Sequence, residues 1–410
     1  MNKLVTSLYL LIAIAIMALL CYFTEVSMNR LAFEIESGST VSFIILAIIA
    51  LSLLPVLFSV KKLIRSSLSV LWIIWIAWMF LIIVVLGLSS MGVSSIFYVL
   101  FSPMVFLFGY IARNHTDKVE WIFVLGFMFL FGLAYFLNII NLSYLNVDIG
   151  EDTAISNLVY WPLCAIPFFF LIPRKWIQAV LLLLTIILVL LTGKRSATIC
   201  IVLIAFFFLF YTLKGEKNKI WSSLIVLTTI LLLYYLIANF FYGTFEGLVE
   251  RMASMKSDQG TGRIPLYKDV FRVLGTNSFV DWFLGRGAGS IRTTGHTNAH
   301  NDALQMLFEF GIVGLFLYLC LLYGLIKRLF LLKKINSRYY FGYLASFIIF
   351  IVLGAVSNLV VFYSYFSFIC IYWGMAEAII VQRNRRRIVV LRKRIRRKFV
   401  YPTQLKRFHY

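Results

Sequence analysis

The stretch from Trp176 to Phe210, WIQAVLLLLTIILVLLTGKRSATICIVLIAFFFLF, decides the fold class of this chain. Two apolar runs flank a short polar connection, Thr192-Gly193-Lys194-Arg195-Ser196. Each run has the length that an α-helix needs to cross the hydrocarbon of a bilayer, about 17 to 25 residues. The stretch therefore predicts two membrane-spanning helices joined by a tight, basic turn.

The rest of the chain repeats this pattern, which predicts an all-α polytopic membrane protein. Of 410 residues, 62% are apolar and 13% are charged, and the mean hydropathy is +0.93. A soluble protein of this composition would leave too much apolar surface in water. The first run has no small-residue cleavage site and is expected to be an anchor. About twelve runs of spanning length begin near Leu4, Val41, Leu68, Val93, Glu120, Leu158, Trp176, Arg195, Ile220, Ala303, Tyr340 and Ser364, the sixth being interrupted by Pro162 and Pro167.

Charges in the connections predict how these helices are oriented. The connections after even-numbered runs are basic, which is typical of cytoplasmic loops, whereas those after the first and fifth runs carry an excess of acidic residues. Both termini are therefore expected in the cytoplasm. Residues 1–382 form one predicted transmembrane domain, and residues 243–302 form one large extracytoplasmic loop with short helices.

The last segment, residues 383–410, is a basic cytoplasmic tail. Twelve of the 38 Lys and Arg residues fall here, and no acidic residue follows Glu377. Because apolar residues are interleaved with these bases, the tail is expected to lie as a helix against anionic lipid of the inner leaflet. Binding to nucleic acid is disfavoured, because a basic segment directly after a last membrane helix is typical of a lipid anchor.

The predicted loop is the one long polar segment of the chain, and its basic residues favour an anionic ligand. Pro265 suits the first turn of a helix, so Arg263 would lie at a helix N-terminus, where free backbone N–H groups favour a phosphate. A solvated arginine on a surface helix fits the same spacing equally well. Ile264, Tyr267, Phe271 and Leu274 recur at helical spacing, which also predicts a helix here.

Two further segments of the loop are distinctive. Leu284-Gly285-Arg286-Gly287-Ala288-Gly289-Ser290 predicts a tight turn whose backbone approaches a helix end or a ligand; it follows no βαβ pattern, which excludes a nucleotide loop. Asn301, Gln305 and Glu309 are four residues apart and share a helix face, and Glu309 is expected to point into the bundle because ionisable groups in membranes rarely face lipid.

A metal site is a weaker interpretation of the same segment. His296 and His300 would have the spacing of a metal pair if they were helical. The other two histidines, His115 and His409, are predicted on the cytoplasmic side, and no HExxH motif is present. We therefore expect no metal.

Four segments together resemble the O-antigen ligase and polymerase superfamily, over roughly Val180 to Leu325. They are Leu191-Thr192-Gly193-Lys194-Arg195-Ser196-Ala197, Gly262-Arg263-Ile264-Pro265-Leu266-Tyr267, Leu284-Gly285-Arg286-Gly287, and His300-Asn301-Asp302-Ala303-Leu304-Gln305 with Glu309, Gly311, Gly314 and Leu315. The resemblance implies a fold similar to the GT-C membrane glycosyltransferases, in the bacterial inner membrane with the active site facing the periplasm. It also implies inverting glycosyl transfer without metal or cofactor, from an undecaprenyl-pyrophosphate-linked glycan donor to an acceptor.

The resemblance also implies roles for individual residues. Arg195 and Arg263 resemble the arginines that such enzymes direct at the lipid pyrophosphate, and His300 resembles the essential histidine beside the acceptor. Guanidinium groups can stabilise the leaving pyrophosphate, and His300 can take the acceptor proton or orient its hydroxyl, with Glu309 as a competing base. The substrate-binding residues are expected to be Lys194, Arg286, Asn301, Gln305 and Glu309.

Three classes of function follow from these observations. The first is a polymerase that joins lipid-linked repeat units, and the near alternative is a ligase that transfers finished glycan to lipid A-core. A polysaccharide or lipid transporter is the third, disfavoured because no repeat relates the two halves of the chain. A chain-length regulator and a flippase are the protein partners that the polymerase interpretation suggests.

Overall fold

The computed structural model describes residues 3–29, 63–87, 94–145, 159–192, 194–215, 235, 263–296, 298–360 and 362–400. Within these residues every regular element is a helix, so the all-α prediction is confirmed for this part of the chain. The predicted membrane runs from Val41 and Ile220 and the first part of the predicted loop lie outside the described residues.

The longer helices are α1 (Lys3–Asn29), α4 (Ser67–Leu86), α5 (Ser94–His115), α6 (Lys118–Leu145), α8 (Lys175–Thr192), α9 (Arg195–Gly215), α14 (Asp302–Lys334), α15 (Tyr340–Val356) and α16 (Tyr363–Val400). Shorter elements are α7 (Tyr160–Phe169), α12 (Arg263–Leu274), α13 (Phe279–Leu284) and the 3-10 turn η2 (Ser290–Thr294).

Four segments of the described helices are long and apolar enough to cross a membrane: Ser67–Leu86, Lys118–Phe136, Asp302–Lys334 and Tyr365–Arg386. Five others are apolar but shorter, so a total of twelve spans stays a prediction. The span expected from Leu158 is wrong as a complete helix. Its helix, α7, has ten residues, which rise about 15 Å and cover half of the hydrocarbon. Pro173, a few residues beyond its end, is incompatible with continuing the helix.

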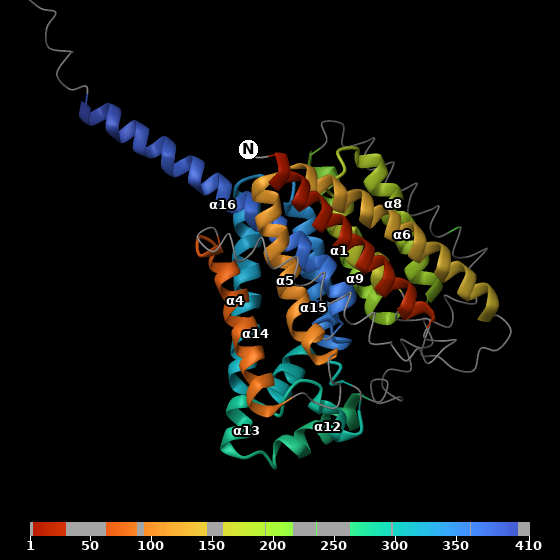
Figure 1. Ribbon diagram of the computed structural model, residues 1–410. Helices are drawn as coiled ribbons and strands as arrows, with labels where there is room; N and C mark the ends of the chain where they lie inside the picture. Colours follow the sequence, from red (N-terminus) through yellow and green to blue (C-terminus); the bar gives the residue numbers. More distant parts are fainter. Residues whose placement is uncertain are drawn as a thin grey trace, which may run out of the picture.

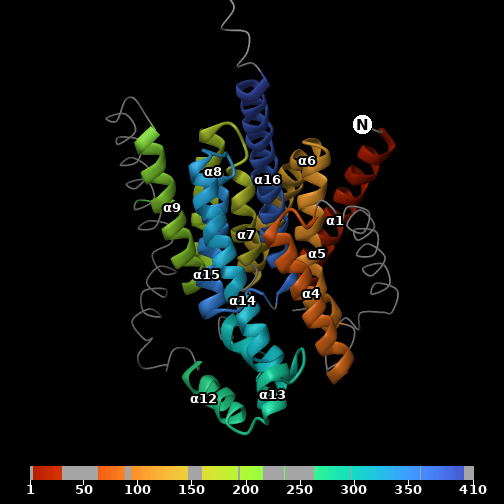
Figure 2. The same ribbon diagram turned by 90° about the vertical axis from the view of Figure 1, so that its left-hand side faces the viewer.

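The helices form a bundle with a distinct cap at one end (Figure 1). α12, α13 and η2 gather there, below α4 and α14, as the turned view also shows (Figure 2). The N-terminus and the basic end of α16 lie at the opposite end of the bundle (Figure 1). In the bundle α5 and α16 approach closely at Gly374, where an added Cβ would lie 2.1 Å from the Phe106 carbonyl oxygen.

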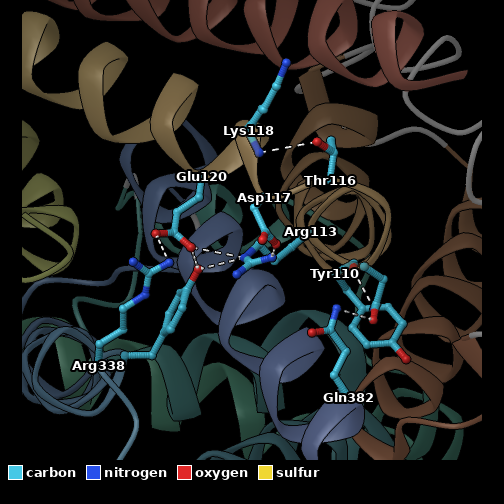
Figure 3. A network of polar contacts seen from close by, with 10 residues as sticks. Tyr110, Arg113, Thr116, Asp117, Lys118, Glu120, Arg338 and Gln382 are labelled. Atoms are coloured by element: carbon cyan, nitrogen blue, oxygen red, sulfur yellow. Dashed lines mark hydrogen bonds and ion pairs between the residues drawn. The ribbon is translucent and has the colours of Figure 1, made fainter. Parts of the chain in front are cut away.

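A polar network holds the end of the bundle opposite the cap (Figure 3). Arg113 donates from Nε to Glu120 Oε2 over 3.1 Å, and its guanidinium also pairs with Asp117. Glu120 accepts a hydrogen bond from the Tyr339 hydroxyl and pairs with Arg338. The turn between α5 and α6 is thereby fixed to the turn between α14 and α15, and the buried carboxylate has several compensating partners.

A second buried ion pair joins α4, α14 and α16. Arg328 donates from Nε and Nη2 to the two oxygens of Glu377, over 3.0 and 3.1 Å. The same carboxylate accepts from the Ser66 hydroxyl at 2.6 Å, and Ser66 also caps α4 by accepting from the Ser69 N–H. Arg328 lies six residues from the end of α14, so this pair fixes the last turns of α14 to the interior of α16, away from the cap.

Helix α14 kinks at Gly311, and the glycine-rich turn docks on the kink. The kink frees backbone carbonyls that the helix would otherwise bond. Arg286 N–H donates to the Phe308 carbonyl at 3.1 Å, Gly287 N–H to Glu309 at 2.9 Å, and Trp78 Nε1 to Phe310 at 3.3 Å. The prediction of a turn with close backbone approach is confirmed, although the turn approaches a kink in a helix and not a helix end.

Replacing Gly311 with alanine should destabilise the protein. Gly311 has φ 68° and ψ −168°, a conformation that is essentially restricted to glycine and costs other residues about 1–3 kcal/mol. An added Cβ would also lie 2.3 Å from the Phe283 carbonyl oxygen. Thermal unfolding of the purified protein in detergent should show a lower midpoint for Gly311→Ala.

The matched control for this substitution is Gly132→Ala. Gly132 lies within α6, and an added Cβ there would meet no atom within 4 Å. Alanine is favoured over glycine inside a helix by roughly 0.5–1 kcal/mol, so this variant should be as stable as the parent. An equal midpoint for Gly311→Ala and the parent would contradict the role assigned to the kink.

Candidate functional site

Helix α12 begins at Arg263, as the sequence predicts, and forms one wall of the cap. Its buried side chains are Leu266, Val270 and Leu274, which pack in a small apolar cluster with Ile291, Ala299 and Phe308. The predicted helix is confirmed, and of the four apolar residues at helical spacing only Leu274 is buried, because Ile264 and Phe271 are exposed and Tyr267 is partly buried. The helix therefore has two apolar stripes, one with Leu266 and Val270 and one with Ile264 and Phe271. Packing against Ile291 and Phe308 decides that the first is buried.

His300 lies in a tight turn between η2 and α14. Its φ is 49°, in the left-handed region that histidine tolerates better than most residues. The turn is held by two successive backbone donors: Ala299 N–H donates to Gln305 Oε1 at 2.7 Å, and His300 N–H donates to Asn298 Oδ1 at 3.2 Å. Asn301 then caps α14 by accepting from Leu304 N–H at 3.0 Å, and its amide donates to the Ala355 carbonyl.

The first turns of α14 carry a buried polar ladder below this turn. Gln305 donates from Nε2 to Glu309 Oε1 at 2.6 Å, and both side chains are fully buried. The prediction that Glu309 points into the bundle is confirmed. Asn358 donates to Gln305 Oε1 at 3.5 Å, and Asp302 accepts from the N–H groups of Leu359 and Val360 at 2.9 to 3.3 Å. The ladder therefore ties the His300 turn to the connection between α15 and α16.

The charges that act on His300 come from segments far apart in the sequence. Burial, then the charges of Arg263, Lys194 and His296, lower the pKa of His300 to about 4. Lys194 directly precedes α9, and Arg263 begins α12. The charges of two predicted site residues, Lys194 and Arg263, therefore act on a third, His300. Arg195 is half-buried in the first turn of α9 but is not among the charges that act most strongly on His300.

A hydroxyl cluster lies beside these charges, and sequence reasoning missed it. The Tyr160 hydroxyl is 2.6 Å from Ser196 Oγ and 2.7 Å from Ser357 Oγ, and all three side chains are buried. The Lys194 ammonium lies 5.6 Å from the centre of the Tyr160 ring. The cluster joins α7, α9 and the end of α15. In the sequence these three residues show only as polar side chains at the boundaries of three apolar runs.

His296 and His300 do not form a helical metal pair. Both lie in the irregular segment between η2 and α14, so the four-residue spacing does not bring them to one helix face. His296 Nε2 lies 3.2 Å from Asp269 Oδ2, which ties this segment to α12. The carboxylate of Asp302 accepts hydrogen bonds from the backbone N–H groups of Leu359 and Val360. The described residues contain no group of three side chains able to hold a metal ion.

Arg286 lies among structural contacts. Its Nε donates to Asn277 Oδ1 at 2.7 Å, and Nη2 donates to Thr276 Oγ1 and the Val273 carbonyl at 3.3 and 3.4 Å. Its guanidinium also lies 5.8 Å from the centre of the Phe308 ring. These contacts fix Arg286 to the end of α12, and its role in substrate binding stays a prediction.

The arrangement around His300 suits an anion. The charges of Lys194 and Arg263 act on an imidazole that is neutral at pH 7, because a group with a pKa near 4 has released its proton three pH units lower. An anionic group bound between Lys194 and Arg263 would be stabilised by charge-assisted hydrogen bonds. The neutral imidazole beside it can accept a proton from a hydroxyl group.

A comparison with known protein families agrees with the resemblance. Residues 180–319 match the family model described as O-Antigen ligase, and this segment contains all eight predicted site residues. No curated protein matches the chain. The matched segment extends from α8 to the middle of α14, and so includes the described part of the cap. This match supports the O-antigen ligase and polymerase superfamily for residues 180–319, and with it an enzyme of the glycosyltransferase type.

Proposed function

We propose that this protein polymerises undecaprenyl-pyrophosphate-linked oligosaccharide units into O-antigen or a related surface polysaccharide, on the periplasmic face of the bacterial inner membrane. The observation that supports the proposal is the effect of the Arg263 and Lys194 charges on His300, all three being residues of the segment that matches the family model. Cations for a pyrophosphate and a neutral base for a hydroxyl are the two requirements of a glycosyl transfer from a lipid pyrophosphate.

The reaction breaks one bond and forms one bond at the anomeric carbon of the donor sugar. The bond from this carbon to the pyrophosphate oxygen breaks, and the electron pair leaves with undecaprenyl pyrophosphate. A hydroxyl oxygen of the acceptor attacks from the opposite face, so the configuration inverts, and its proton passes to His300. Arg195 and Arg263 are assigned to the charge that develops on the leaving group, with Lys194 binding the donor.

Donor binding should also adjust the basicity of His300. The cations that bind the pyrophosphate are the same ones that lower the pKa of His300 in the free protein. A pyrophosphate between them compensates their charge and favours the imidazolium form, so the pKa rises. A base works best with a pKa near the working pH, so His300 would become an effective base when the donor is in place.

A titration of His300 tests this coupling. The chain has four histidines, so isotope-labelled imidazole signals can be assigned by substitution. The pKa of His300 should be about 4 in the free protein and should rise when undecaprenyl pyrophosphate is added. His115, which stacks on Tyr9 at the end of α5, should not respond. An unchanged pKa of His300 with bound lipid would contradict the coupling.

Ligation to lipid A-core is the second candidate, because the matching family model is described as O-Antigen ligase. The two reactions share the donor and differ in the acceptor. Purified protein in nanodiscs should be given the lipid-linked donor with either a second lipid-linked repeat unit or lipid A-core.

Polymerase activity predicts a ladder of longer lipid-linked glycans with the first acceptor and no product with the second. Glycan joined only to lipid A-core would overturn the polymerase assignment in favour of the ligase. Absence of transfer to both acceptors, by protein that is folded and binds the donor, would contradict both.

A further inference from the structure

Helix α13 presents an apolar surface outside the proposed site. Phe279 is 85% exposed, and Val280, Trp282 and Phe283 are exposed as well. At 3.6 residues per turn these side chains, with Leu284, cover more than half of the helix circumference. Asp281 occupies the remaining side and folds back on Ser278, which it contacts at 2.8 Å. So much apolar surface on one short helix marks an interaction site.

Contacts with α4 fix the depth of α13 relative to the membrane. The Phe283 ring packs edge-on against Trp78, with ring centres 6.1 Å apart. Trp78 lies eight residues before the end of α4 at Leu86, which is about 12 Å along the helix axis. Because the 20 residues of α4 rise about 30 Å and match the hydrocarbon thickness, Phe283 contacts α4 within the depth of the hydrocarbon.

The exposed face of α13 adjoins the lipid-facing surface of α4. Beyond Trp78, the side chains of Phe80, Val84 and Val85 are exposed and apolar, as expected for a spanning helix that faces lipid. Gly287, three residues after α13, lies beside Leu86. In both views α13 lies next to the end of α4 (Figures 1 and 2). Exposed apolar side chains of α4 and of α13 therefore lie on adjoining elements, which meet where Trp78 contacts Phe283.

We propose that α13 is an interfacial anchor that inserts Phe279, Val280 and Trp282 into the bilayer leaflet on the side of the cap. Aromatic side chains concentrate at this boundary in membrane proteins. A capping box provides hydrogen-bond partners for backbone N–H groups at the start of the helix: Asp281 N–H donates to Ser278 Oγ, and Ser278 N–H donates to Asp281 Oδ2. Backbone donors near hydrocarbon need such partners, because no water is there to accept from them.

Lipid is a better occupant for this surface than a second copy of the chain. A stable protein interface buries about 800 Å² on each partner, more than a six-residue helix can supply by itself. Among the described residues, the apolar surface of α4 beside α13 is one that a spanning helix turns to lipid. The proposal does not depend on which glycosyl transfer the protein performs.

Spin labels in nanodiscs of phosphatidylethanolamine and phosphatidylglycerol test the insertion. The five cysteines are replaced by alanine, and a nitroxide is attached at Phe279→Cys, Val280→Cys or Asp281→Cys. Frequent collisions of the nitroxide with oxygen indicate that the label lies in hydrocarbon. Frequent collisions with a soluble nickel chelate indicate that it lies in water. Labels at 279 and 280 should favour oxygen, as should the lipid-facing reference Val84→Cys, whereas the label at 281 should favour nickel.

Two outcomes would overturn the anchor. Nickel-dominated collisions at 279 and 280 would show that this face of α13 lies in water, and labels inaccessible to both reagents would show that protein covers it. A second measurement keeps the native cysteines. A photoreactive benzophenone amino acid at position 279 should crosslink to lipid, and a crosslinked dimer in place of the lipid adduct would contradict the proposal.

Discussion

Replacing Arg263 with alanine should lower the rate of glycan transfer by about 10²- to 10³-fold, the effect of removing one donor to a developing charge. Arg263 begins α12, and its charge acts on both His300 and Tyr160. Arg263→Lys should restore little of the rate, because an ammonium cannot reproduce the planar grip of a guanidinium on two phosphate oxygens. Arg195→Ala should have an effect of similar size.

Single-turnover transfer from lipid-linked donor, at equal amounts of folded protein in nanodiscs, measures this loss. The matched control is Arg272→Ala, on the same helix. Arg272 is largely exposed and pairs with Asp269 over 3.0 Å, and exposed pairs contribute only about 0–1 kcal/mol. If Arg263→Ala transferred glycan as fast as both Arg272→Ala and the parent, the charge of Arg263 would have no role in transfer.

Local rules predicted the elements that depend on local causes. The start of α12 at Arg263 follows from Pro265, and the approach of residues 285–287 to another backbone follows from glycine, the one residue without a Cβ. The inward direction of Glu309 follows from the cost of a charge in lipid. In each case the sequence itself contains the cause.

Features that depend on tertiary partners were missed or wrong. Nothing near Tyr160 indicates that its hydroxyl meets Ser196 and Ser357, which lie 36 and 197 residues away. The face of α12 that is buried depends on Ile291 and Phe308, and two apolar stripes were available. The protein contacts of Arg286 illustrate the same limit, because a motif shows a guanidinium but not the Asn277 and Val273 oxygens that accept from it.

Replacing His300 should abolish most of the turnover while leaving donor binding intact. Loss of a general base lowers rates by roughly 10²- to 10⁴-fold, and the cations assigned to the donor, Arg263 and Lys194, remain in place. Because His300 has a φ of 49°, alanine would strain the turn as well as remove the base. His300→Asn separates the two effects, since asparagine tolerates the left-handed conformation but its side-chain amide cannot accept the proton of the acceptor hydroxyl at pH 7.

Transfer rate and donor affinity, measured on the same nanodisc preparations, decide the role of His300. Both His300→Asn and His300→Ala should bind the lipid-linked donor as the parent does and transfer it at the reduced rate. His296→Ala is the control from the same irregular segment, because it removes the contact with Asp269 without removing the proposed base, and it should keep most of the activity. Near-normal chain assembly by His300→Asn would remove the histidine from the chemistry, and its turn would then serve only to lead the chain into α14.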